Sequence, residues 1–124
     1  MTLRVVIADD EPLARDQLRH LLAAEPGVAI VRECANGPET VAAVRADKPD
    51  LLLLDIQMPD RDGFEVLFEL RPEETPAVIF VTAYDQYALK AFEVRALDYL
   101  LKPVDPRRLR EALSESLVRE AALD

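Results

Sequence analysis

Five residues have side chains that could take part in phosphoryl chemistry: Asp9, Asp10, Asp55, Thr82 and Lys102. Each lies at the end of an apolar run of the sequence or closely follows one. Carboxylates brought together repel one another unless a cation joins them. Oxygen ligands favour Mg²⁺ over zinc, and no cluster of His and Cys residues accompanies them in the sequence. A carboxylate can attack phosphorus to form an aspartyl-phosphate, while a lysine and Mg²⁺ neutralise the phosphoryl oxygens. If the fold brings these residues together, they predict a Mg²⁺-dependent phosphoryl site.

Asp55 is the candidate nucleophile. The four leucines before it, residues 51–54, show no polar alternation, which is typical of a parallel strand buried on both faces. Pro59 and Gly63 then favour a loop. A central strand would therefore deliver Asp55 to the carboxyl edge of the sheet, where open α/β sheets bind ligands. At that edge the Thr82 hydroxyl could donate a hydrogen bond to a phosphoryl oxygen.

Each of these residues also has a plainer interpretation when it is taken alone. Asp10 could cap the first helix, and Asp55 could be a solvated turn residue. Thr82 could be an ordinary strand-end residue, and Lys102 could be a surface lysine. Only their arrival at one edge of a sheet favours the chemical interpretation.

The positions of the apolar runs predict an α/β fold of five strand–helix units. Strands are expected at residues 3–8, 28–34, 51–55, 77–82 and 96–101, and helices at 12–24, 37–48, 63–70, 84–94 and 106–122. Such alternation predicts a parallel sheet with helices on both faces. Right-handed crossovers leave few strand orders, among them the flavodoxin-like order 2-1-3-4-5 with its switch point between the first and third strands. In that order the polar strand ends share one edge, and Leu13 and Phe68 are expected to face the core.

Length and charge limit the classes of protein to which the chain can belong. At 124 residues it is expected to form one domain. The net charge of −9, from 24 acidic and 15 basic residues, argues against direct binding to a nucleic-acid backbone. No apolar run approaches the ~20 residues of a membrane helix, and the N-terminus is unlike a cleavable signal, so we expect a cytoplasmic protein without membrane contact. Cys34 is expected to be a buried thiol, and His20 a surface or helix-packing residue.

Four segments of the sequence resemble the receiver domain of bacterial two-component response regulators: IADDEPLAR, LLLLDIQMPDRDG, VTAYDQYALKAF and ALDYLLKP. The resemblance covers essentially the whole chain and implies a single receiver domain, residues 1–124, of the flavodoxin/CheY-like fold. The last two segments are most similar to receivers attached to LytTR-type DNA-binding domains. The resemblance therefore implies regulation of transcription through an output domain outside this chain.

The resemblance implies a phosphoacceptor switch that assists its own phosphorylation and dephosphorylation, rather than an enzyme with a separate substrate. A sensor histidine kinase would phosphorylate Asp55. Mg²⁺ would be bound by Asp10, by Asp55, by Asp9 through water and by the main-chain carbonyl of Gln57. Lys102, which precedes a cis Pro103, would contact the phosphoryl group, and Thr82 and Tyr99 would be the switch residues. Gln57 and Tyr84 would control the lifetime of the phosphorylated state.

The output surface of such a switch would be formed by the fourth helix, the fifth strand and the fifth helix. Its charged residues carry both signs, which suits a symmetric contact. Exposed charge pairs contribute only ~0–1 kcal/mol each, so a dimer would need apolar contacts, for which Leu89 and Val94 are candidates. We therefore expect phosphorylation to enhance homodimerisation.

Three other classes of protein fit the sequence less well. A haloacid-dehalogenase-like phosphatase has two aspartates two residues apart, whereas Gln57 follows Asp55 at that spacing and no cap insertion is present. A receiver-like module that is never phosphorylated would normally lack one of the acids or the lysine. A flavodoxin would need phosphate-binding amides in its first loop, but residues 8–12 are acidic.

Overall fold

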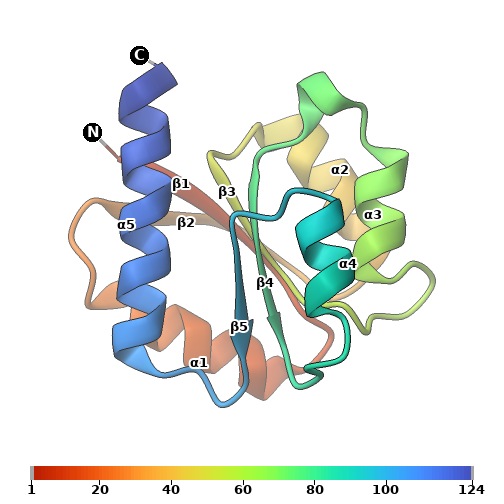
Figure 1. Ribbon diagram of the computed structural model, residues 1–124, viewed down its shortest axis with the longest axis horizontal. Helices are drawn as coiled ribbons and strands as arrows, with labels where there is room; N and C mark the ends of the chain where they lie inside the picture. The colour runs from red at the N-terminus through yellow and green to blue at the C-terminus, as the bar shows by residue number, and fades with distance from the viewer. Residues whose placement is uncertain (1, 124) are drawn as a thin grey trace.

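Five strands alternate with five α-helices along residues 2–123, which are the residues that the computed structural model describes (Figure 1). The strands are β1 (Leu3–Ala8), β2 (Val28–Cys34), β3 (Leu51–Leu54), β4 (Ala77–Thr82) and β5 (Asp98–Leu101). The helices are α1 (Pro12–Ala23), α2 (Gly37–Asp47), α3 (Gly63–Glu69), α4 (Ala88–Glu93) and α5 (Pro106–Leu123), with a short 3₁₀ helix at Pro72–Glu74.

The strands form one parallel sheet in the order β2-β1-β3-β4-β5, which confirms the predicted fold. The central strand β3 pairs with β1 on one side and β4 on the other, and all four of its leucines are buried. Burial on both faces explains why this strand shows no polar alternation in the sequence.

The strand side chains divide between two apolar layers. Val5 and Ile7 of β1 point to the layer covered by α1 and α5, whereas Val6 and Ala8 point to the layer covered by α2, α3 and α4 (Figure 1). Residues alternate between faces along a strand, so helices on both sides bury both sets. Within residues 2–123 no helix has both the length and the apolar character needed to cross a membrane.

The fourth helix is shorter than predicted, starting at Ala88 rather than at Tyr84. The Tyr84 carbonyl accepts a hydrogen bond from the Tyr99 hydroxyl, so it is occupied by a partner outside the helix. The fifth strand also begins later than predicted, at Asp98. Both differences are tertiary effects that lie beyond local sequence preference.

Two residues expected in the core are on the surface, since Leu13 is 84% exposed and Phe68 is 71% exposed. Leu18 and Leu22 define the buried stripe of α1, and Leu13, five residues before Leu18, is rotated roughly 140° from it. In α3 the inward side is set by Gly63 and Val66, and Phe68 lies outside it. The prediction that both side chains face the core was therefore wrong.

Candidate functional site

A pocket at the carboxyl ends of the strands is lined by seven residues: Asp10, Glu11, Asp55, Gln57, Ala83, Tyr84 and Lys102. Asp9 lies beside them, and Asp9, Asp10, Glu11 and Asp55 each place an oxygen within 4.8 Å of the others. These groups come from the ends of β1, β3, β4 and β5. The topology thus joins residues up to 93 positions apart at the switch point between β1 and β3.

Asp55 is held rigidly by its own backbone and by the loop that follows. Its N–H donates to the Ala8 carbonyl at 2.9 Å, and its Oδ1 accepts from the Ile56 N–H at 2.7 Å. A Cβ on Gly63 would lie 2.6 Å from the Asp55 carbonyl oxygen, so the loop can fold this closely behind Asp55 only with glycine. Asp55 Oδ2 remains directed toward Lys102.

Lys102 provides a positive charge among the carboxylates. Its Nζ lies 2.7 Å from Asp9 Oδ2, 3.2 Å from Asp55 Oδ2 and 3.2 Å from Glu11 Oε1. Burial lowers the pKa of Lys102, but Asp9 and Asp55 outweigh this effect and raise it, so the ammonium keeps its charge. The peptide bond between Lys102 and Pro103 is cis, as the family resemblance implied.

The buried carboxylates are only partly compensated by this lysine. Burial, followed by the charge of Asp9, raises the pKa of Asp55, and Lys102 offsets part of the rise. Asp9 Oδ2 is buried, and the Lys102 ammonium at 2.7 Å is the contact that offsets its charge. An acidic cluster with an oxygen of this kind suits a hard divalent cation, as expected of a receiver Mg²⁺ site. Asp10 is exposed at the rim, so the repulsion is concentrated on Asp9 and Asp55.

Asp9→Asn should stabilise the metal-free protein, because one buried carboxylate then faces one lysine. Because the pKa of Asp55 is raised in the folded protein, Asp55 stays protonated to a higher pH there than in the unfolded chain. The stability of the fold therefore falls as pH rises from ~4 through the folded-state pKa. In EDTA near pH 7 we expect the variant to melt about 4 °C higher, equivalent to about 1 kcal/mol, with a flatter pH profile.

Thermal melting with and without Mg²⁺ measures this effect. Asp10→Asn is the matched control, since its exposed carboxylate should change the metal-free melting temperature less while still weakening the response to Mg²⁺. An Asp9→Asn protein that melts below wild type in EDTA would show that the Asp9–Lys102 pair outweighs the repulsion.

Thr82 and Tyr99 both contact Tyr84. Thr82 is buried at the end of β4, and its Oγ1 accepts from the Tyr84 N–H at 3.4 Å. The half-buried Tyr99 ring packs against Phe80, with 6.3 Å between ring centroids, and its hydroxyl donates to the Tyr84 carbonyl. The two residues of the predicted switch are therefore joined through one loop residue.

Sequence reasoning missed two residues around the site. Glu11 contacts Lys102, and its position directly after Asp9 and Asp10 could have indicated that it lies at the site. Tyr87 contacts Gln57 from the loop before α4, a distance across the fold that no local pattern indicates.

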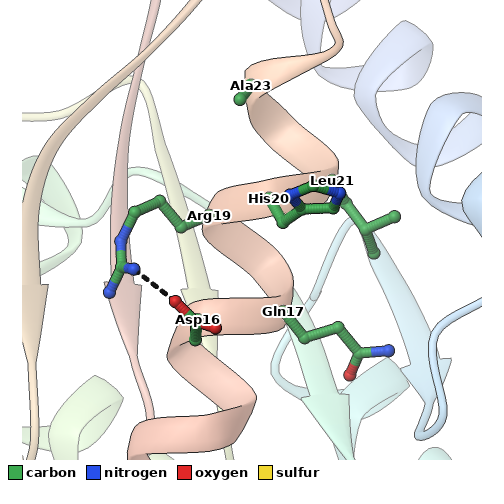
Figure 2. Close-up of a pocket in the computed structure, with 6 residues that line it drawn as sticks. All are labelled: Asp16, Gln17, Arg19, His20, Leu21 and Ala23. Carbon is green, nitrogen blue, oxygen red and sulfur yellow. Dashed lines mark hydrogen bonds and ion pairs between the residues drawn. The ribbon is translucent and has the colours of Figure 1, made fainter.

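A second hollow lies on the outer face of α1, away from the strand ends (Figure 2). Arg19 there pairs with Asp16 at 2.6 Å and with Glu33 at 2.7 Å. His20 is exposed in this hollow, in agreement with the predicted surface role. Cys34 is buried, also as predicted, and burial raises its pKa to about 11.

The Response regulator receiver domain family matches residues 5–114, and the chain belongs to this family. Among its relatives, the transcriptional regulatory protein BtsR of Salmonella typhi is 51% identical over 111 residues, covering 90% of this chain and 46% of BtsR. BtsR of Escherichia coli (strain K12) is 50% identical over 112 residues, covering 90% of this chain and 47% of that protein. The chain thus spans about half the length of these curated relatives.

Solved structures show the same fold. The REC domain of AraT, a response regulator from Geobacillus stearothermophilus, matches with a TM-score of 0.86 and 34% identity, over 100% of both chains. A LuxR-family response regulator from Aurantimonas sp. SI85-9A1 matches with a TM-score of 0.86 and 31% identity, over 95% of this chain and 86% of that one.

Proposed function

We propose that Asp55 accepts a phosphoryl group from a sensor histidine kinase in a Mg²⁺-dependent reaction, and that this modification switches the receiver between two surfaces. The observation that carries the proposal is the placement of Lys102 Nζ 3.2 Å from Asp55 Oδ2, within a cluster of four carboxylates whose oxygens lie close enough to bind one cation. Asp10 and Asp55, Asp9 through water, and the Gln57 main-chain carbonyl would hold Mg²⁺. When bound, Mg²⁺ supplies charge neutralisation at the phosphoryl oxygens.

In this reaction the Asp55 carboxylate attacks phosphorus, and the P–N bond to the kinase histidine breaks with its electron pair going to the imidazole. Lys102 already points at Asp55 and would donate to a phosphoryl oxygen as negative charge accumulates there. The Thr82 hydroxyl, at the end of the neighbouring strand, would donate to another. Asp55 is regenerated when water later hydrolyses the acyl phosphate.

A small phosphodonor tests this proposal without the kinase. Incubation with acetyl phosphate and Mg²⁺ should add the mass of one phosphoryl group to the intact protein, and EDTA should suppress the addition. A haloacid-dehalogenase-like phosphatase would instead release phosphate from phosphoesters through repeated turnovers. Turnover of phosphoesters without accumulation of labelled protein would favour that class.

Gln57 and Tyr84 are proposed to tune the lifetime of the phosphorylated state. Both line the pocket, and Tyr84 is 41% exposed beside the small Ala83. Tyr84→Ala should therefore admit water more readily and lose its phosphoryl group about fivefold faster, a change of about 1 kcal/mol in the barrier. The decay of labelled protein measures this rate, and equal rates in the two proteins would contradict a role for the Tyr84 ring.

The proposed output surface is formed by α4, β5 and α5. Movement of Thr82 toward the phosphoryl group would break its contact with Tyr84 and allow Tyr99 to turn inward, since packed cores change between discrete arrangements. Leu89 of α4 is 72% exposed, Phe92 is 79% exposed and Leu101 of β5 is 47% exposed. These residues add exposed apolar area to the charged face.

Phosphorylation-enhanced homodimerisation through this surface is the expected consequence. Sedimentation with and without beryllofluoride, a phosphoryl mimic, should show a larger dimer fraction with the mimic. Leu89→Ser should reduce that fraction because it removes apolar contact area, whereas Leu13→Ser, at a leucine of α1 that is even more exposed, should not. An unchanged monomer at high protein concentration would mean that the signal leaves by another surface.

We further propose that the receiver acts in the cytoplasm on a LytTR-type DNA-binding output domain outside these 124 residues. BtsR is named as a transcriptional regulatory protein and is about twice the length of this chain, which supports a receiver domain joined to a separate DNA-binding domain. The net charge of −9 leaves DNA contact to the other domain. A fusion of this chain to such a domain should bind DNA more tightly with beryllofluoride than without it.

A further inference from the structure

Tyr87 links the phosphoacceptor loop to the start of α4. The Gln57 side-chain amide donates to the Tyr87 hydroxyl at 3.4 Å, across 30 positions of sequence. We propose that Tyr87 is a positioning residue that holds the Gln57 side chain on the α4 side of the pocket and thereby prolongs the phosphorylated state. This inference rests on the proposed phosphorylation of Asp55.

The position of the Tyr87 hydroxyl is fixed by packing of its ring. The ring centroid lies 6.1 Å from that of Phe64 and 6.2 Å from that of Tyr84, with the Tyr84 ring edge-on. Phe64 is itself buried and packs on Phe80 at 5.0 Å, while Lys90 Nζ lies 4.5 Å from the Phe64 ring centroid. Tyr87 is thus anchored to the core and can hold an exposed, flexible side chain in place.

Gln57 is exposed and lines the pocket two residues after Asp55. Its amide is bonded to Tyr87, and Gln57 and Tyr84 both line the pocket. Without that bond the amide can turn across the pocket and hydrogen-bond a water beside the phosphoryl group. A water oriented in this way attacks phosphorus more readily, so release of Gln57 should shorten the lifetime.

The same loop has a second attachment, through the Tyr99 hydroxyl at the Tyr84 carbonyl. Residues 84–87 are therefore tied at one end to the proposed switch tyrosine and at the other to the phosphoacceptor loop. Loosening either end should affect both the lifetime and the position of α4.

Tyr87→Phe is the direct test because it removes the hydroxyl and retains the ring contacts. In the unphosphorylated protein, the Gln57 side-chain amide resonance should shift on Tyr87→Phe, and this readout does not depend on phosphorylation. In labelled protein, the rate of phosphate loss should rise about threefold, as expected for one long hydrogen bond. Gln86→Met, at an exposed residue of the same loop that does not line the pocket, is the control and should change neither the resonance nor the rate.

A double-mutant cycle with Gln57→Met decides whether Tyr87 acts through Gln57. In the Gln57→Met background, Tyr87→Phe should leave the rate of phosphate loss unchanged. The inference is overturned by an unshifted Gln57 resonance, by an unchanged or slower rate in Tyr87→Phe alone, or by the same acceleration in both backgrounds. Absence of labelling at Asp55 in wild type and in every variant would instead refute the proposed function. The resonance shift would still show whether the Gln57–Tyr87 hydrogen bond forms.

Discussion

Asp55→Asn should abolish phosphoryl transfer, with uptake from acetyl phosphate falling to background. An amide oxygen lacks the charge and nucleophilicity of a carboxylate, and no covalent acyl phosphate can form. The substitution preserves shape, so the bond from the Ile56 N–H to Oδ1 can remain. It also removes the buried charge whose pKa is raised by burial and Asp9, so the variant should be at least as stable as wild type without metal. Intact mass and thermal melting of the same samples therefore separate loss of chemistry from loss of fold.

Asp60→Asn is the matched control on the same loop. Asp60 is exposed and has φ 70°, a backbone conformation that asparagine also tolerates. It should label as wild type does. Labelling of Asp55→Asn at the wild-type rate would move the phosphoacceptor to another residue, and peptide mapping would then identify it.

The sequence predicted the sheet and the acidic pocket at its edge because both depend on strongly patterned segments. Leu51–Leu54 has the pattern typical of a strand buried on both faces, and such a strand places Asp55 at its carboxyl end. Right-handed crossovers left few strand orders, and in the order 2-1-3-4-5, which the structure shows, Asp9 and Lys102 lie at the same sheet edge as Asp55. These are consequences of topology, so errors of one or two residues at element ends did not matter.

The rest depends on contacts that only the folded chain creates. Nothing local showed that the Tyr84 carbonyl would bond the Tyr99 hydroxyl, which is why α4 was predicted to start four residues early. Leu13 was predicted as part of the apolar stripe of α1, yet it is rotated away from the buried Leu18 and Leu22 and is 84% exposed. The Gln57–Tyr87 contact likewise joins two loops whose proximity is set by packing around Phe64.

Lys102→Met should produce the largest loss of stability among the substitutions considered. The side chain of Lys102 is 16% exposed and lies within ion-pair distance of Asp9 and Asp55, which would be left as uncompensated buried charges. Breaking a buried pair by removing one partner is strongly destabilising, and partial exposure reduces the effect here, so we expect a loss of about 2 kcal/mol. For a domain of this size that lowers the melting temperature by about 8 °C.

The pH dependence of stability shows whether the charge of Lys102 is responsible for this loss. The raised pKa of Lys102 means that its contribution is fully present below its unfolded pKa of ~10.4 and is lost only as pH rises through the folded value. Wild type should therefore keep this stabilisation throughout the neutral range.

In Lys102→Met the Asp55 pKa should rise further, so the variant's deficit should be smallest near pH ~4 and grow toward neutrality. Mg²⁺ should recover part of the loss by restoring positive charge among the carboxylates. Lys90→Met removes an exposed lysine that lies over the Phe64 ring, and its effect on stability should depend on neither pH nor Mg²⁺. A Lys102→Met deficit that is independent of both pH and Mg²⁺ would mean that the lysine stabilises the fold through packing of its stem rather than through its charge.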